Sequence, residues 1–182
     1  SGNGSNLQAI IEACKKGKIA ATLSLVLSDK PQAYALKRAS KAGIPTVVVS
    51  PQDFSSREIF DRAVVRILRQ KKIDFIVLAG FMRILSPVFV RAFKGRILNI
   101  HPALLPAFKG AHAIRDAFEA KVKVTGVTVH IVDEEVDHGP VVGQAAVEIQ
   151  AQDTLPALES RVHKAEHALY SKTIDTFARR LK

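Results

Sequence analysis

The chain has 182 residues, a formal net charge of +10 and 47% hydrophobic residues. This length is enough for one hydrophobic core, so we expect a single domain over residues 1–182. No stretch approaches the roughly 18 consecutive apolar residues of a membrane span, and no secretion signal opens the sequence. The one cysteine, Cys14, cannot form an internal disulfide, so we expect a cytoplasmic protein that does not contact a membrane.

The sequence opens on a glycine-rich segment, SGNGSNLQAI, that runs directly into a predicted helix. Free backbone N–H groups and the helix dipole at such a start favour an anion. The dinucleotide fingerprint needs a third glycine where this chain has Leu7, although Asp29 lies where an acidic residue would hold a ribose. We therefore interpret Gly4, Ser5 and Asn6 as a loop for one phosphate, with a dinucleotide site and a purely structural turn as alternatives.

Apolar segments of strand length alternate with longer segments of helical period along the rest of the chain. Strands are predicted at residues 22–28, 46–49, 75–79, 97–100, 125–132 and 141–149. Helices are predicted at residues 6–16, 32–42, 56–70, 112–120 and 154–180. Ser55 and Glu58 have capping-box spacing at the start of the third helix. This order predicts an α/β fold with a Rossmann-like, mostly parallel, twisted sheet and helices on both of its faces.

The last two predicted strands are joined by VDEEVDHGP, which is too short for a helical crossover. We therefore expect an antiparallel hairpin at the C-terminal side of the parallel strands. Ligands of such sheets gather at the carboxyl ends of the parallel strands. The segments expected there are SGNGSN, AGFMRILS, NIHPALLP and the acidic hairpin loop.

Two side chains at the end of the fourth predicted strand are candidates for catalysis. Asn99 and His101 are two positions apart, so both leave the same face of the strand. An amide and an imidazole directed at one point could stabilise an oxyanion or move a proton. A capping Asn and a satisfied buried His would explain the same residues. Asp137, in the hairpin turn, is either a carboxylate held for the same site or an ordinary turn residue.

The segment HKAEH, from His163 to His167, matches the H-x-x-E-H pattern of one class of metalloprotease. Such enzymes need a third ligand further along, and after His167 the only acidic side chain is Asp175 on the same helix. We therefore predict no metal site and interpret HKAEH as a helix face beside a site.

The basic residues lie mostly on polar faces or ends of predicted helices and are not interleaved with aromatic residues that would stack on bases. This distribution favours a solvated exterior, or attraction of a multiply anionic small substrate, over a nucleic-acid surface. We therefore expect no nucleic-acid partner.

The segments SGNGSNLQAI, AGFMRILS, NIHPALLP, GVTVHIVDEEVDHGPVV and RVHKAEHALY occur in the order and spacing of the glycinamide ribonucleotide formyltransferases. The chain resembles this folate-dependent family of purine biosynthesis over nearly its whole length. The resemblance implies transfer of a formyl group from 10-formyltetrahydrofolate, a co-substrate, to the amine of glycinamide ribonucleotide by a monomer or homodimer. It also implies that residues 1–100 bind the substrate phosphate, and that residues 101–182 supply the catalytic loop, hairpin and last helix.

The resemblance gives each candidate residue a role. The catalytic residues are Asn99, His101 and Asp137. The substrate-binding residues are Gly4, Ser5, Asn6 and Glu166, the last holding the ribose. The folate-binding residues are Arg83, Ile84, Leu85, Asp133 and Val136. Thr128 occupies a position where relatives carry Ser or Thr near the catalytic water.

The chain departs from this family in three places. Ala103 and Lys109 stand where many relatives have Ser and Pro. Family members also carry a short apolar strand ahead of the glycine-rich loop, in mid-sheet, so we expect this sequence to begin inside a longer natural chain. The alternatives are methionyl-tRNA formyltransferase, the hydrolase that sends the formyl group to water, a non-catalytic nucleotide-binding module and a basic RNA-binding domain.

Overall fold

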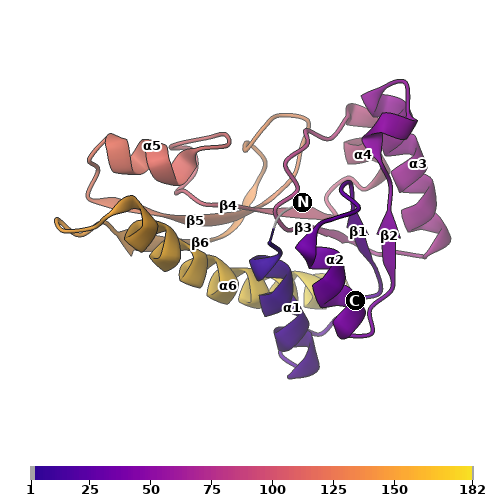
Figure 1. The fold of residues 1–182 in the computed structure, drawn as a ribbon, viewed down its shortest axis with the longest axis horizontal. Helices are drawn as coiled ribbons and strands as arrows, with labels where there is room; N and C mark the ends of the chain where they lie inside the picture. The colour runs from indigo at the N-terminus through magenta and orange to yellow at the C-terminus, as the bar shows by residue number, and fades with distance from the viewer. Residues whose placement is uncertain (1–2, 182) are drawn as a thin grey trace.

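A computed structural model of the chain describes residues 3–181, so Ser1 and Gly2 of the glycine-rich loop lie outside the described residues. Figure 1 shows the arrangement of its helices and strands. The helices are α1 (Ser5–Lys15), α2 (Tyr34–Lys41), the 3-10 turn η1 (Pro51–Asp53), α3 (Arg57–Gln70), α4 (Pro87–Ala92), α5 (Ala113–Glu119) and α6 (Leu155–Arg180). The strands are β1 (Val26–Ser28), β2 (Thr46–Val48), β3 (Ile76–Leu78), β4 (Ile97–His101), β5 (Val124–Ile131) and β6 (Val141–Glu148).

The strands form two sheets. β1 and β2 pair in parallel, and a second sheet has the order β3-β4-β5-β6. Within it β3 and β4 are parallel, whereas β4–β5 and β5–β6 are antiparallel. The predicted α/β class with an antiparallel C-terminal hairpin is confirmed.

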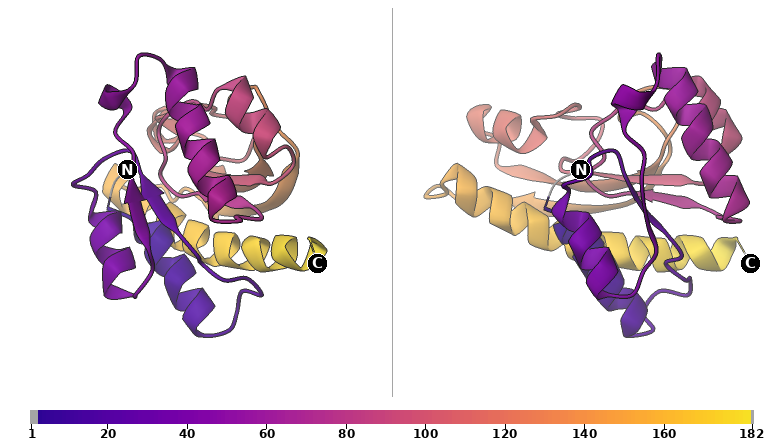
Figure 2. Two further views of the ribbon diagram at one scale, coloured as in Figure 1. Left: turned by 90° about the vertical axis from the view of Figure 1, so that its right-hand side faces the viewer. Right: turned by 45° about the vertical axis from the view of Figure 1, so that its right-hand side comes forward.

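Side chains on β4 alternate between two layers of helices. Leu98 and Ile100 pack with Ile10 of α1 and Tyr170 of α6, while Ile97 packs with Phe60 of α3 on the opposite face. Figures 1 and 2 show α6 running along the larger sheet. No helix in the described part of the chain is long and apolar enough to cross a membrane. The predicted cover of helices on both faces is thus present at β4.

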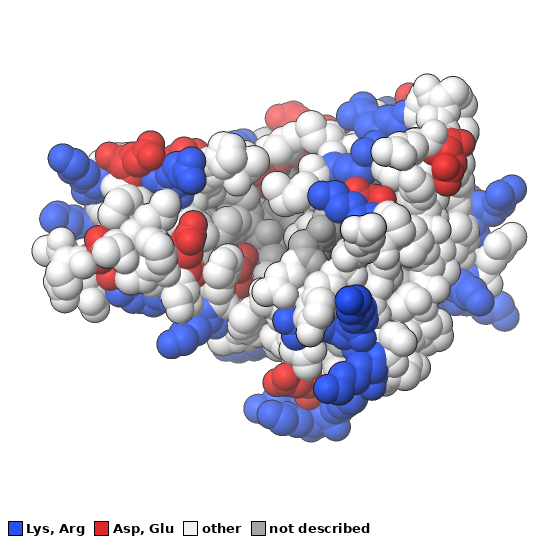
Figure 3. Space-filling model, viewed as in Figure 1, with Lys and Arg blue, Asp and Glu red and all other residues white. Residues whose placement is uncertain are grey.

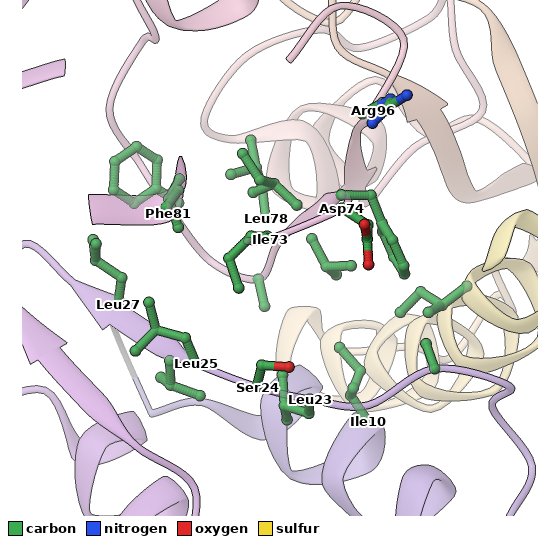
Figure 4. A pocket seen from close by; sticks show the side chains of 18 of the residues that line it. Ile10, Leu23, Ser24, Leu25, Leu27, Ile73, Asp74, Leu78, Phe81 and Arg96 are labelled. Carbon is green, nitrogen blue, oxygen red and sulfur yellow. The ribbon is translucent and has the colours of Figure 1, made fainter. Parts of the chain in front are cut away.

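An apolar cleft separates the two sheets. It has a volume of about 610 Å³ and is lined from one side by Leu23, Leu25 and Leu27 and from the other by Ile73 and Leu78 (Figure 4). Within residues 3–181, β1 and β3 belong to different sheets and do not pair with each other. Leu23, Leu25 and Leu27 occupy every second position of an extended segment. They therefore share one face of that segment and line the cleft together.

Several boundaries differ from the sequence-based expectations. The strand predicted at 22–28 is regular only from Val26, because β2 offers a hydrogen-bonding partner only along Val26–Ser28. The cap of α3 is Ser56, whose hydroxyl accepts from Ile59 N at 3.2 Å, and Ser55 does not cap it. Helix α4 was not predicted, although Ser86 at its N-cap followed by Pro87 is a start signal.

Tyr170 joins α6 to the centre of the larger sheet. Its ring is 1% exposed, and its hydroxyl donates to the carbonyl oxygens of Leu78 on β3 (2.8 Å) and Leu98 on β4 (3.1 Å). Burial raises the pKa of this phenol, so the hydroxyl keeps the proton that it donates. One side chain therefore fixes the helix against two neighbouring strands.

Removing this hydroxyl should destabilise the fold. Tyr170→Phe leaves two carbonyl oxygens without their donor at nearly constant volume, so the free energy of unfolding should fall by about 1–3 kcal/mol. Urea denaturation measures the change. The chain has two tyrosines, and Tyr34→Phe at the 51% exposed Tyr34 is the matched control, expected within about 0.5 kcal/mol of the unaltered protein. Equal stability of the two variants would contradict the role of Tyr170.

Candidate functional site

Neighbouring strands bring four polar side chains to one face of the larger sheet. Asn99 and His101 are two positions apart on β4, and the antiparallel register sets them opposite His130 and Thr128 of β5. Side chains on directly opposite residues of a strand pair point to the same face. The predicted pairing of Asn99 with His101 on one face is therefore present, with two further polar groups beside them.

The imidazole of His101 lies between two oxygen acceptors. Its Nδ1 is 3.3 Å from Oδ2 of Asp137, and its Nε2–H donates to the carbonyl oxygen of Phe108 at 2.7 Å. Both ring nitrogens can donate at once only when the ring is protonated. His101 is 4% exposed, and Asp137 is the acidic side chain that lies against its Nδ1.

A constrained turn holds Asp137 in place. Asp137 has a φ of +49°, its carboxylate accepts from Gly110 N at 2.9 Å, and a Cβ at Gly139 would overlap the carbonyl oxygen of Ile131. Burial alone would raise the pKa of Asp137, but the rings of His130 and His101 and the Gly110 N–H hold it below its ordinary value. The carboxylate thus stays ionised at neutral pH.

His130 is the residue of this site that sequence reasoning missed. Its Nδ1 lies 3.1 Å from the carbonyl oxygen of Ile131, and its Nε2 lies 3.2 Å from Nδ2 of Asn99. A carbonyl oxygen only accepts, so Nδ1 carries a proton that it donates to Ile131, and the other ring nitrogen lies against the side-chain amide of Asn99. Nε2 is also 3.7 Å from Oδ1 of Asp137, too far for a hydrogen bond. His130 is two residues after Thr128 on the same predicted strand, so both side chains share one face. That spacing was the sequence signal that could have placed His130 in the site.

Thr128 connects β5 to the loop that follows His101. Its hydroxyl donates to the carbonyl oxygen of Ala103 at 2.7 Å and accepts from Leu105 N at 3.0 Å and from Nε2 of Gln144 at 2.9 Å. Gln144, on β6, also donates to the carbonyl oxygen of Leu105. Thr128 and Ala103 are both completely buried, and the hydroxyl of Thr128 shapes the loop.

The glycine-rich loop ends in an open helix N-terminus. Gly4 has a φ of +74° and provides no capping side chain, and the first amide that bonds within α1 is Gln8 N, to the carbonyl oxygen of Gly4. The amides of Ser5 and Asn6 precede it and belong to the turn whose N–H groups have no partner within the helix. Oδ1 of Asn6 is buried without a hydrogen-bond partner among the described residues. This end of α1 can accept an anion.

Glu166 lies on α6 in contact with a histidine of the same helix. Its Oε2 is 2.7 Å from Nδ1 of His163, and its carboxylate is 6% exposed. This hydrogen bond is the main reason that the pKa of His163 is raised, against the opposing effect of burial. The pair therefore stabilises the fold below the ordinary pKa of histidine, and that contribution is lost as the pH rises through the raised pKa. Of the two histidines of HKAEH, the other, His167, has a buried Nε2 without a partner among residues 3–181.

The five candidate folate residues lie in two loops that leave the same hydrophobic cluster. Leu85 and Val132 pack on the cluster that includes Phe60. Ile84 and Val136 are 58% and 50% exposed, and Met82, in the same loop as Ile84, is 68% exposed, so both loops present apolar side chains to solvent. The other two are held by neighbours: the Arg83 guanidinium lies 5.1 Å from the ring centroid of Phe60, and Asp133 pairs with His138 at 2.8 Å.

The large cleft between the sheets is separate from the catalytic candidates, because Asn99, His101 and Asp137 do not line it. No group of three or more metal-ligating side chains that could hold an ion occurs within residues 3–181. Figure 3 shows Lys and Arg side chains at several places on one face, with a group of them at its lower middle, over α1 and α2. Asn99, His101 and Asp137 together offer an amide, an imidazole and a carboxylate, which can donate and accept hydrogen bonds and move a proton.

Comparison with known proteins identifies a family for this chain. A family model described as Formyl transferase matches residues 1–174. The phosphoribosylglycinamide formyltransferase of Escherichia coli is 48% identical over 98% of this chain and 84% of its own length, and that of Bacillus subtilis is 44% identical over 96% and 89%. A crystal structure of phosphoribosylglycinamide formyltransferase from Bacillus halodurans superposes with a TM-score of 0.96 at 44% identity, covering all of this chain and 94% of that one.

Some relatives are much longer. The trifunctional purine biosynthetic protein adenosine-3 of Drosophila melanogaster is 48% identical over 96% of this chain, but the chain spans 13% of the length of that protein. The similarity therefore concerns one part of the trifunctional proteins.

The contact between Glu166 and His163 can be tested directly. Glu166→Gln removes the carboxylate that stabilises the imidazolium, so the pKa of His163 should fall toward the ordinary value of about 6.5. NMR titration of the six histidines measures it. His138, whose pKa is raised by Asp133 and Glu135, is the internal control and should titrate as before. An unchanged titration of His163 would contradict the pairing seen on α6.

Proposed function

The chain belongs to the formyl transferase family, and from this premise we propose that it transfers a formyl group from 10-formyltetrahydrofolate to the amine of glycinamide ribonucleotide. The observation that carries the proposal is the contact of a buried imidazole with a carboxylate at 3.3 Å beside an amide on the same sheet face. The family match over residues 1–174 also supports a single formyltransferase domain.

The reaction needs stabilisation of one oxygen and movement of one proton. The amine attacks the formyl carbon, and the carbonyl oxygen becomes an oxyanion. The carbon–nitrogen bond to the folate then breaks, and the proton lost by the attacking nitrogen reaches the leaving nitrogen. Asn99 and protonated His101 donate hydrogen bonds to the oxyanion, where one donor is worth about 10²- to 10³-fold in rate. Asp137 keeps His101 charged and passes the proton through water.

The carbonyl of Phe108 must move before His101 can donate to the oxyanion. In the structure this carbonyl oxygen accepts the Nε2–H of His101 at 2.7 Å. The formyl oxygen of the substrate replaces that carbonyl when the loop moves. Phe108 has a φ of +51°, an uncommon conformation for a bulky residue, so a displaced loop can adopt a more common one.

The remaining candidates complete the proposed site. Gly4, Ser5 and Asn6 hold the substrate phosphate, and Glu166 accepts from the ribose hydroxyls. The loops carrying Ile84 and Val136 form opposite walls for the folate, whose apolar ring system covers their exposed side chains.

The first experiment follows loss of the formyl group from 10-formyltetrahydrofolate with and without glycinamide ribonucleotide. Loss that requires the ribonucleotide supports the proposal. Loss to water alone would identify a hydrolase, and loss only with charged methionyl-tRNA would identify the tRNA-specific enzyme. A folded protein that causes no loss would overturn the folate assignment.

Asp137→Asn should reduce kcat by at least about 10²-fold, because the amide cannot favour the imidazolium or take up a proton. Steady-state kinetics measures the change, and thermal melting verifies that the variant is folded. Asp116→Asn, on the exposed surface of α5, removes the same charge elsewhere and should leave kcat within about twofold of the unaltered protein. Similar kcat values for the two variants would show that Asp137 has no part in the reaction.

A further inference from the structure

Arg38, on α2, contacts both sides of the glycine-rich loop. Its Nε donates to the carbonyl oxygen of Asn3 at 2.9 Å and its Nη2 to Oδ1 of Asn3 at 3.2 Å. Its Nη1 donates to Oε1 of Gln8 at 3.2 Å. Asn3 directly precedes Gly4 in the loop, and Gln8 lies one turn into α1. One planar group therefore connects the loop to the helix that follows it.

Helix α2 is also the surface on which the loop lies. A Cβ at Gly4 would come within 2.9 Å of Cα and Cβ of Ala35, one turn before Arg38 on the same helix. The ring of Tyr34 lies 4.8 Å from the Arg38 guanidinium and limits its movement. The conformation that opens the first amides of α1 thus depends on contacts with α2.

The charge of Arg38 is not neutralised by an acidic partner. Its three acceptors are a backbone carbonyl and two side-chain amides, and none of the ion pairs within residues 3–181 includes it. The carboxylate of Glu12, one turn further along α1, accepts from Nε2 of Gln8 at 3.0 Å. A positive charge beside an open helix N-terminus strengthens the attraction for an anion.

We propose that Arg38 is a positioning residue that holds the segment from Asn3 to Asn6 in its phosphate-binding conformation and so sets the affinity for the 5′-phosphate of the substrate. The proposal rests on the proposed function of this loop. Arg38 acts through the loop, since its three bonded nitrogens donate to the chain itself. The effect should therefore concern phosphate binding and leave the chemical step unchanged.

The test compares two variants on two amine substrates. Arg38→Met should raise KM for glycinamide ribonucleotide by about tenfold or more, with kcat and the KM for the formyl donor within about twofold. With the ribonucleoside that lacks the 5′-phosphate, Arg38→Met and the unaltered protein should have the same kcat/KM. Lys37→Met removes the same charge from the neighbouring exposed residue, which does not contact the loop, and should change KM less than about twofold.

The outcomes distinguish a role in phosphate binding from support of the fold. An equal loss of kcat/KM on both amine substrates would show that Arg38 only supports the fold and would overturn the proposal. A change in KM with Lys37→Met as large as that with Arg38→Met would also overturn it. Calorimetric binding of ribose 5-phosphate provides a readout that does not need catalysis, so absence of formyl transfer by the unaltered protein would defeat the proposed function alone. If Arg38→Met does not fold, the test uses Arg38→Lys. A lysine keeps the charge but lacks the planar group that bonds both sides of the loop. Unchanged affinity for ribose 5-phosphate in a folded variant would refute the proposal.

Discussion

The antiparallel register between β4 and β5 is the constraint on which the site depends. It sets Asn99 opposite His130 and His101 opposite Thr128 on one face of the sheet. Because successive residues of a strand point to opposite faces, a slip by one residue would turn one strand's polar pair into the layer packed on α6. Val127 and Val129 are completely buried on that other face, and exposing them would cost several kcal/mol. Core packing thus fixes the geometry of the polar face.

Sequence patterns predicted what depends on local chemistry. The spacing of Asn99 and His101 gave their common face, and the alternation of apolar segments gave the α/β order. The pairing of β4 with β5 is a contact between residues about 30 positions apart, and no local pattern specifies it. For that reason His130 was missed, although it touches Asn99. The start of β1 was misplaced for a similar cause, since its regular part is defined by the short partner β2.

The site divides its groups between rigid and adaptable segments. Asn99, His101, Thr128 and His130 project from strands whose positions Tyr170 and the core maintain. Asp137, Phe108 and Gly110 lie in loops, and Asp137 and Phe108 both have positive φ values. Groups on strands are held to a precise geometry, whereas loop groups can move when a ligand replaces their hydrogen bonds. Asn99 and His101, the proposed donors to the oxyanion, therefore belong to the rigid part.

The loop hydrogen bonds explain how a buried polar site is stable before substrate arrives. The Nε2–H of His101 is satisfied by the carbonyl oxygen of Phe108, and Oδ2 of Asp137 is satisfied by Gly110 N. A buried donor left without a partner costs about 1–3 kcal/mol, so these contacts protect the folded state. The carbonyl of Phe108 offers His101 the same kind of acceptor as a formyl oxygen. In the proposed mechanism, substrate binding exchanges one acceptor for another, and the imidazole need not be reorganised for the chemical step.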